Sequence, residues 1–146
     1  MLIVLDTNVL ISALITPFGN AARILDMILI GGLQTLYDDR ILSEYREVLS
    51  RPKFGFEKKD VEALLSFVEG EGFRITAMPL KEASTDEDDV PFIEVAISGE
   101  TDALITGNKR HFAGRYAKRL KIMTTDEFLK FWRQKKTTFS TSSEKN

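Results

Sequence analysis

Carboxylate side chains border short apolar segments of this sequence in a pattern that suits a cation site. The apolar run 2–5 ends on Asp6, Glu44 lies on the flank of an apolar helical face, and Asp89 closes the acid-rich stretch 84–89. Carboxylates that crowd together repel one another and shift toward protonation unless a cation relieves the repulsion. Oxygen ligands favour Mg²⁺ or Mn²⁺. Such an ion in an acidic site commonly serves chemistry on phosphate esters.

The residue types that the chain lacks exclude several other kinds of metal site and catalysis. The sequence has no cysteine, which excludes disulfides, zinc–thiolate sites and thiol catalysis. His111 is the single histidine, so one chain cannot supply a multi-histidine metal site.

The length of 146 residues fits one domain. We predict a folded domain over residues 1–134 and a polar, disordered C-terminal tail over residues 135–146. No apolar run approaches the roughly 20 residues that cross a bilayer. The N-terminus also lacks the basic region of a secretory signal. These features favour a cytoplasmic protein with no membrane partner.

Charge is distributed unevenly along the chain. The formal net charge is −2, but residues 57–94 carry eleven Asp or Glu against four Lys or Arg, and residues 107–136 carry ten Lys or Arg against two Asp or Glu. The basic residues are densest in the stretch 109–121. This asymmetry is typical of a phosphate-binding face beside an acidic site. A solvated surface whose charges cluster by chance explains it equally well.

Short apolar strands alternate with amphipathic segments, which predicts an α/β sandwich around a mainly parallel sheet. We expect strands at 2–5, 33–37, 73–78, 103–106 and 121–123, and helices at 8–15, 20–30, 38–50, 57–69, 90–98 and 124–134. Parallel neighbours need right-handed crossovers, so the carboxyl ends of the strands share one edge, where open sheets bind ligands. Acids that are distant in sequence are therefore expected to meet there.

Each acid also has an ordinary structural explanation. Asp6 can instead cap a helix that begins near Asn8, and Asp89 can cap the helix that begins near Val90. Glu44 can be a boundary residue that reaches solvent. The site interpretation depends on the three acids acting together.

Four motifs then resemble those of PIN domains, in the expected order and on the expected elements. They are LDTNVLIS (5–12), SEYREVL (43–49), DEDDVPFIEVA (86–96) and ALITGNKRHF (103–112). The resemblance covers residues 1–134 and is strongest to the branch related to VapC ribonuclease toxins. It implies a Rossmann-like, three-layer sandwich with a central, mainly parallel sheet of about five strands.

The resemblance also implies a function and its residues. We expect an Mg²⁺- or Mn²⁺-dependent ribonuclease that cleaves single-stranded or loop RNA, the toxin of a toxin–antitoxin system. Asp6, Glu44 and Asp89 would hold the metal. The resemblance adds Asn108 to the catalytic set, with Thr7, Asn8, Asp88 and Thr106 in supporting positions. Its partners would be RNA, a cognate antitoxin and further copies of the chain in a homodimer or larger homo-oligomer.

One position departs from the family pattern. Many PIN domains carry a fourth acid where this chain has Asn108 or His111, and the loss of that charge weakens the expected affinity for a second metal. Asp88 and Asp102 are possible substitutes, although Asp102 should lie at the wrong end of its strand. The alternative function is therefore a catalytically weak or inactive PIN-domain RNA-binding protein.

The basic stretch 109–121 would supply the RNA contacts. The phosphate-binding candidates are Arg110, Arg115, Lys118 and Arg119. His111, Phe112 and Tyr116 could stack on bases, although Phe112 fits better as a core residue.

Two other functions fit less well. Phosphatases with an aspartyl nucleophile usually place a second Asp two residues after the first, where this chain has Asn8. A dinucleotide-binding fold would carry a G-x-G-x-x-G sequence after the first strand, and none is present.

Overall fold

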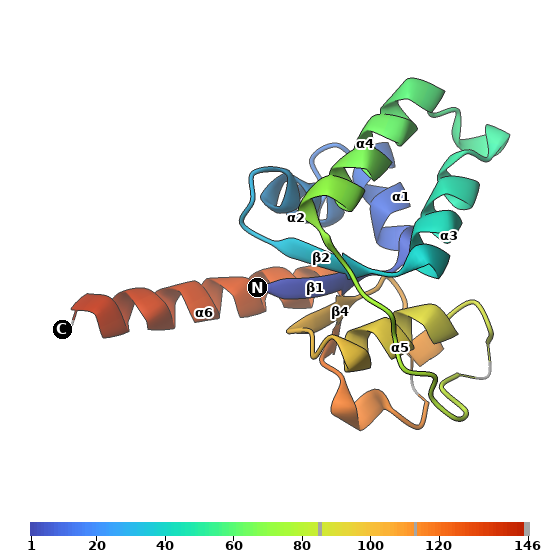
Figure 1. Ribbon diagram of the computed structural model, residues 1–146. Helices are drawn as coiled ribbons and strands as arrows, with labels where there is room; N and C mark the ends of the chain where they lie inside the picture. Colours follow the sequence, from blue (N-terminus) through green and yellow to red (C-terminus); the bar gives the residue numbers. More distant parts are fainter. Residues whose placement is uncertain (85, 113, 145–146) are drawn as a thin grey trace.

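The computed structural model describes residues 1–84, 86–112 and 114–144, with side chains as far as residue 136. Residue 85 in the predicted loop, residue 113 in the basic stretch and residues 145–146 of the predicted tail lie outside the described residues. Five parallel strands form one sheet in the order β3-β2-β1-β4-β5 (Figure 1). The strands are β1 (Leu2–Leu5), β2 (Gln34–Tyr37), β3 (Phe73–Arg74), β4 (Ala103–Ile105) and β5 (Ile122–Met123).

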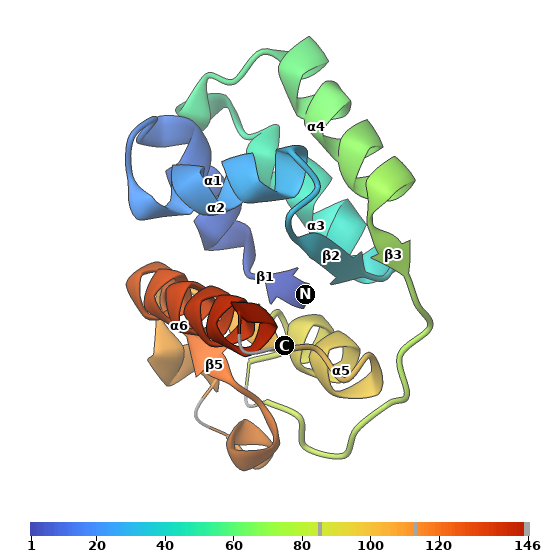
Figure 2. The same ribbon diagram turned by 90° about the vertical axis from the view of Figure 1, so that its left-hand side faces the viewer.

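Helices cover both faces of this sheet and make three layers. The α-helices are α1 (Thr7–Ile15), α2 (Asn20–Leu29), α3 (Asp39–Leu49), α4 (Lys58–Glu71), α5 (Val90–Ser98) and α6 (Thr125–Glu144). Helix α5 packs on β1, β2 and β4, whereas α6 packs against α2, β4 and β5. Figure 2, a view nearly along the strands, shows α5 on one face and α2 with α6 on the other.

The central strands are wholly apolar because both of their faces are buried. Ile3, Val4 and Leu104 are fully buried. The register pairs Leu5 with Ile105, so the next residue along each strand emerges at the same edge. Asp6 N–H donates to Ile105 O at 2.9 Å. Parallel pairing thus brings together polar residues from opposite ends of the sequence.

Two elements differ from the sequence prediction. Strand β3 has two residues instead of the predicted six over 73–78. Its partner β2 ends at Tyr37, where the chain turns into α3, so no backbone remains to pair with residues 76–78. Helix α6 extends to Glu144 instead of ending near Gln134. A helix that has already nucleated gains one hydrogen bond for each added residue. Whether residues 135–146 are disordered stays a prediction.

The start of α6 follows the prediction. Thr124 Oγ1 accepts a hydrogen bond from Glu127 N–H at 3.2 Å, and a Glu127 carboxylate oxygen accepts one from Thr124 N–H at 3.0 Å. This reciprocal pair is the capping box expected from the spacing of these two residues.

No single helix among the described residues is long and apolar enough to cross a membrane. In that part of the chain, α1 and α2 reach the required length and composition only as a pair, bent by 101°.

Candidate active site

Asp6 lies at the carboxyl end of β1, in the N-cap position of α1, with only 7% of its surface exposed. Its carboxylate accepts no capping hydrogen bond from the helix. Instead, Thr106 Oγ1 donates to Asp6 Oδ2 at 2.7 Å from the end of β4. The capping explanation is therefore wrong for the Asp6 side chain, which is oriented by a neighbouring strand.

Glu44 reaches the same region from the second turn of α3. It is half-buried, and its carboxylate accepts a hydrogen bond from Thr7 Oγ1. Thr7 is the first residue of α1 and is itself buried. The threonine predicted to support the site thus links Glu44 to the residue after Asp6.

Asp89 occupies the N-cap position of α5 and is also 7% exposed. It too accepts no capping hydrogen bond. Among the described residues, Asp89 Oδ2 is a buried side-chain oxygen without a hydrogen-bond partner. A buried carboxylate oxygen without a donor is costly, so this oxygen is suited to bind a cation or another ligand.

Asp38 shows what a structural acid looks like in this fold. It occupies the N-cap position of α3 and its Oδ1 accepts the Ile41 N–H at 3.0 Å. Arg40 pairs with Asp38 at 2.7 Å and with the buried Glu94 of α5 at 2.7 Å. Asp38 thus caps its own helix, whereas the Asp6 carboxylate accepts from a residue beyond β4 and Asp89 Oδ2 has no partner among the described residues.

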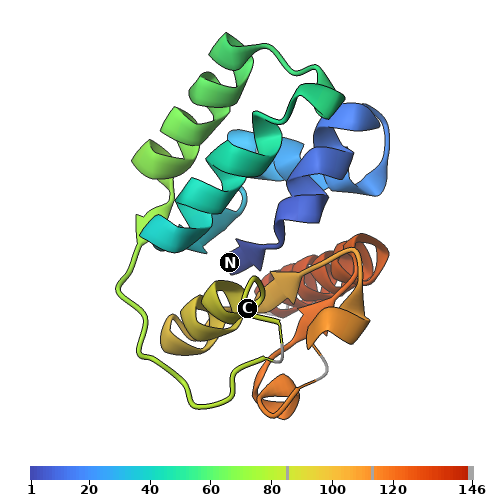
Figure 3. The ribbon, with the colours of Figure 1, turned by 90° about the vertical axis from the view of Figure 1, so that its right-hand side faces the viewer.

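One cavity of about 250 Å³ joins the three predicted metal ligands. Figure 3 looks onto this edge of the sheet, where α1, α3 and α5 surround the end of β1. The polar residues that line the cavity are Asp6, Thr7, Asn8, Glu44, Arg51, Lys53, Asp86, Asp88, Asp89 and His111. Carboxylates from three separate parts of the sequence therefore share one cavity, as predicted from the parallel topology.

Burial raises the pKa values of all three carboxyl groups, and repulsion from neighbouring acids adds to the effect for Glu44 and Asp89. Burial raises the pKa of Asp6, opposed by the Thr106 hydrogen bond and by nearby amides of α1 that lie outside capping geometry. Burial likewise raises the pKa of Glu44, with the charges of Asp6 and Asp88 adding to the effect. The pKa of Asp89 rises to about 6 because of burial and the charge of Asp86.

These residues fit a hard divalent cation. All three side chains offer oxygen atoms, and the partnerless Asp89 Oδ2 has capacity for a ligand bond. Within the described part of the chain, no three Asp, Glu or His side chains are arranged closely enough to coordinate an ion as they stand. Ion binding therefore requires the carboxylates to draw together, against the repulsion that contributes to the raised pKa values of Glu44 and Asp89.

Comparison with known families assigns the chain. The sequence model for the PIN domain matches residues 2–110. This chain belongs to the PIN domain family. Among curated proteins, none matches the sequence.

A solved structure shares the PIN-domain fold. It is the crystal structure of VapBC2 from Rickettsia felis bound to a DNA fragment from their promoter. The superposition has a TM-score of 0.55 and covers 85% of this chain and 98% of that chain, with 14% sequence identity. At this identity the similarity supports the fold alone, an α/β sandwich with an all-parallel five-stranded sheet.

Asn108 and Asp102 lie away from the acidic cavity of this PIN domain. Asn108 is exposed and does not line the cavity, and its Oδ1 accepts the Arg110 N–H at 3.1 Å. That contact shapes the loop after β4. Asp102 Oδ2 accepts the Leu2 N–H at 2.8 Å, at the opposite end of the strands, as expected.

The predicted phosphate-binding cations also lie outside the cavity lining. Arg115 pairs with Glu82 at 3.4 Å. The guanidinium groups of Arg115 and Arg119 lie 5.9 and 5.8 Å from the ring centre of Tyr116. Lys118 is exposed on the short helix Ala117–Arg119, and Arg110 lines a separate apolar hollow. Their contact with RNA stays a prediction.

Five further residues that line the cavity lie outside the predicted catalytic and supporting set. Asp86 belongs to the acid-rich loop that indicates the site, and the sequence predicts base stacking for His111, which also occupies a position where many PIN domains carry an acid. Arg51, Lys53 and Phe54 come from the turn after α3, which the strand-edge argument does not cover. Two cations beside a proline and an aromatic residue were visible in the sequence, but nothing local placed them near the acids. By contrast, Phe112 is 1% exposed and belongs to the core, as its spacing favours.

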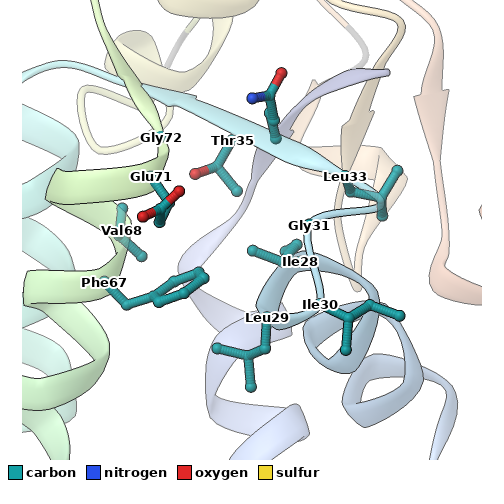
Figure 4. A pocket seen from close by; sticks show the side chains of 11 residues that line it. Ile28, Leu29, Ile30, Gly31, Leu33, Thr35, Phe67, Val68, Glu71 and Gly72 are labelled. Atoms are coloured by element: carbon teal, nitrogen blue, oxygen red, sulfur yellow. The ribbon is translucent and has the colours of Figure 1, made fainter.

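A second hollow, of about 310 Å³, lies at the other end of the sheet (Figure 4). Its walls combine apolar and polar residues and come from the ends of α2 and α4 and the start of β2. Glu71 is its single titratable side chain, so the hollow lacks the charge cluster found around Asp6.

Proposed function

We propose that this PIN domain is an Mg²⁺- or Mn²⁺-dependent endoribonuclease that cleaves single-stranded or loop RNA, the toxin of a toxin–antitoxin pair. The proposal includes a protein antitoxin as partner, assembly into a homodimer or larger homo-oligomer, and a cytoplasmic location. Membership of the PIN family supports the proposed hydrolytic chemistry. The similarity to VapBC2 supports the fold that this chemistry needs.

The observation that carries the proposal is the buried, partnerless oxygen of Asp89 in a cavity that it shares with Asp6 and Glu44. Asp6 and Asp89 occupy helix N-cap positions without capping, and Asp89 Oδ2 is buried with no partner among the described residues. Natural folds rarely leave a buried carboxylate oxygen unsatisfied without a functional reason. A divalent cation would satisfy this oxygen and relieve the repulsion between Asp6, Glu44 and Asp89 together.

The surrounding residues prepare these acids to bind the ion. When bound, the ion would polarise a phosphoryl oxygen and lower the pKa of a water molecule. Thr106 keeps one oxygen of Asp6 engaged and so fixes the orientation of the carboxylate. Thr7 does the same for Glu44. The amino ends of α1 and α5 meet at the cavity, and their positive dipole ends favour a phosphate there.

A second candidate function is RNA binding without efficient cleavage. The observation that favours it is the position of Asn108, whose side chain caps the following turn instead of lining the cavity. Many PIN domains carry a fourth acid at the position of Asn108 or of His111. In this chain the first position holds a neutral residue outside the cavity, and the second holds a histidine on the cavity wall. In this case the site would hold one ion weakly and bind RNA with little turnover.

The two candidates are separated by a cleavage assay on a labelled single-stranded RNA in Mg²⁺, Mn²⁺ or excess EDTA. The nuclease proposal expects metal-dependent cleavage that Asp6→Asn and Asp89→Asn each reduce by about 100-fold or more. Asp102→Asn is the matched control, because this acid lies at the other end of the strands. Cleavage that persists in EDTA rejects the metal mechanism. Salt-sensitive RNA binding without turnover in any metal favours the second candidate.

A further inference from the structure

A short basic and aromatic turn forms one wall of the acidic cavity and has no part in the chemistry described so far. Arg51, Lys53 and Phe54 all line the cavity. They belong to the turn after α3, in which Pro52–Phe54 form a 3₁₀ helix. Residues 51–54 are called the rim segment below.

The rim segment is held firmly in relation to Glu44, because both belong to one continuous hydrogen-bonded unit. Arg51 N–H donates to Val48 O at 3.2 Å, in the last turn of α3. Gly55 N–H donates to Pro52 O at 3.1 Å, and Gly55 has φ 66°, a left-handed conformation that favours glycine. The position of the rim segment is therefore set by the same helix that carries Glu44.

Lys53 is the cation best placed to meet a phosphate at this cavity. Five carboxylates line the cavity, so a polyanion needs positive charge close by. Arg51 is already engaged by Glu47 through two hydrogen bonds of 3.1 and 2.9 Å. In the described part of the chain, Lys53 makes no ion pair, and its Nζ lies 5.0 Å from the ring centre of Phe54.

Phe54 offers an aromatic surface next to this cation. It is half-buried and stacks on Phe56, with ring centres 5.6 Å apart and planes 11° apart. The stack holds the ring in place at the edge of the cavity. Bases of single strands stack on such rings with little sequence preference, whereas paired bases in a duplex have no free face.

We propose that the rim segment is the nucleic-acid contact of this site: Lys53 binds a backbone phosphate, Phe54 stacks an adjacent base, and the ligand is an unpaired single strand. The inference rests on the proposed function, and it moves the main RNA contact away from the basic stretch 109–121. No Lys or Arg of that stretch lines the cavity.

The test is fluorescence anisotropy with a labelled oligouridylate of about 12 nucleotides, in EDTA, over about 50 to 200 mM salt. Lys53→Met should weaken binding about 3- to 10-fold and reduce the slope of log K against log salt by about 0.7. Lys118→Met is the matched control, with the same change at an exposed position that does not line the cavity. It should leave both quantities unchanged.

Variants of Phe54 test stacking separately from charge. Phe54→Leu should weaken binding of the single strand at least about fivefold, and Phe54→Tyr should restore it. Circular dichroism shows whether each variant is folded. The same oligonucleotide annealed to its complement should bind wild type and Phe54→Leu equally.

Several outcomes overturn the inference. They are an unchanged affinity in Lys53→Met, a loss in Lys118→Met as large as in Lys53→Met, and the absence of single-strand binding by the wild type in EDTA and in Mn²⁺. Cleavage measured in parallel keeps the two proposals apart. RNA binding through Lys53 without cleavage supports the rim segment as the nucleic-acid contact and rejects the nuclease function. Cleavage with an unchanged KM in Lys53→Met supports the nuclease function and rejects the rim segment as the contact.

Discussion

Thr106 Oγ1 donates a hydrogen bond to Asp6 Oδ2 across 2.7 Å, joining two residues that are one hundred positions apart in the sequence. Both are almost fully buried and each directly follows a strand of the central parallel pair. The contact lowers the pKa of Asp6 against the effect of burial. It therefore keeps more of this acid ionised, the form that a cation requires.

Replacing this hydroxyl should damage both stability and metal binding. Thr106→Val keeps the side-chain shape but leaves Asp6 Oδ2 without its donor, which should cost about 1–3 kcal/mol in the free energy of unfolding. Mn²⁺ affinity, measured by calorimetry, should fall about 10-fold or more. Thr106→Ser retains the donor and should behave nearly as wild type. An unchanged affinity in Thr106→Val would show that Asp6 does not bind the ion.

The raised pKa of Asp89 predicts a specific dependence of stability on pH in the metal-free protein. The pKa is about 6 in the folded chain, above the ordinary value of 3.8 that applies to the unfolded chain. Between these values the folded state binds more protons than the unfolded state, so stability falls as pH rises through this window. Asp89→Asn removes the unfavourable free energy of the buried, ionised carboxylate. It should therefore stabilise the protein by about 1–2 kcal/mol at neutral pH.

Urea unfolding in EDTA at several pH values across that window tests this directly. Asp60→Asn makes the same chemical change at an exposed position on α4 and should leave the pH profile of the wild type intact. A wild-type stability that rises across the window, or an Asp89→Asn variant less stable than wild type at neutral pH, contradicts the assignment.

Divalent cations should stabilise the folded chain by mass action. At a Mn²⁺ concentration about 100 times Kd, the free energy of unfolding should increase by about 2.7 kcal/mol. The increase in Tm should disappear in Asp6→Asn and persist in Asp102→Asn, whose acid lies at the other end of the strands. Equal shifts in both variants would indicate that Mn²⁺ binds elsewhere.

Arg40 is expected to support the fold without taking part in the site. It bridges Asp38 on α3 and the buried Glu94 on α5, and Glu94 also accepts the Leu80 N–H at 2.7 Å. Arg40→Met leaves two acids without their cation and should destabilise the protein by about 1–3 kcal/mol, measured by urea unfolding. Mn²⁺ affinity at a temperature where the variant is folded should not change. A loss of affinity would place Arg40 within the functional site.

Much of the fold could be predicted because its determinants are local. The wholly apolar runs 2–5 and 103–106 identify strands buried on both faces, and the Thr124–Glu127 spacing identifies the start of α6. Once the sheet is parallel, the ends of its strands share an edge, which brings Asp6, Glu44 and Asp89 to one cavity. The strand predicted over 73–78 failed because its length depends on where β2 ends.

The sequence by itself therefore determined most of the elements, their parallel arrangement and the meeting of three acids. Only the tertiary structure decided which acids cap their helices. Asp38 caps its helix, whereas Asp6 and Asp89, in equivalent N-cap positions, do not. It also placed Lys53 at the cavity and the basic stretch 109–121 largely outside it. The physical reason is that the surroundings of a charge depend on groups from distant parts of the chain, which no local pattern contains.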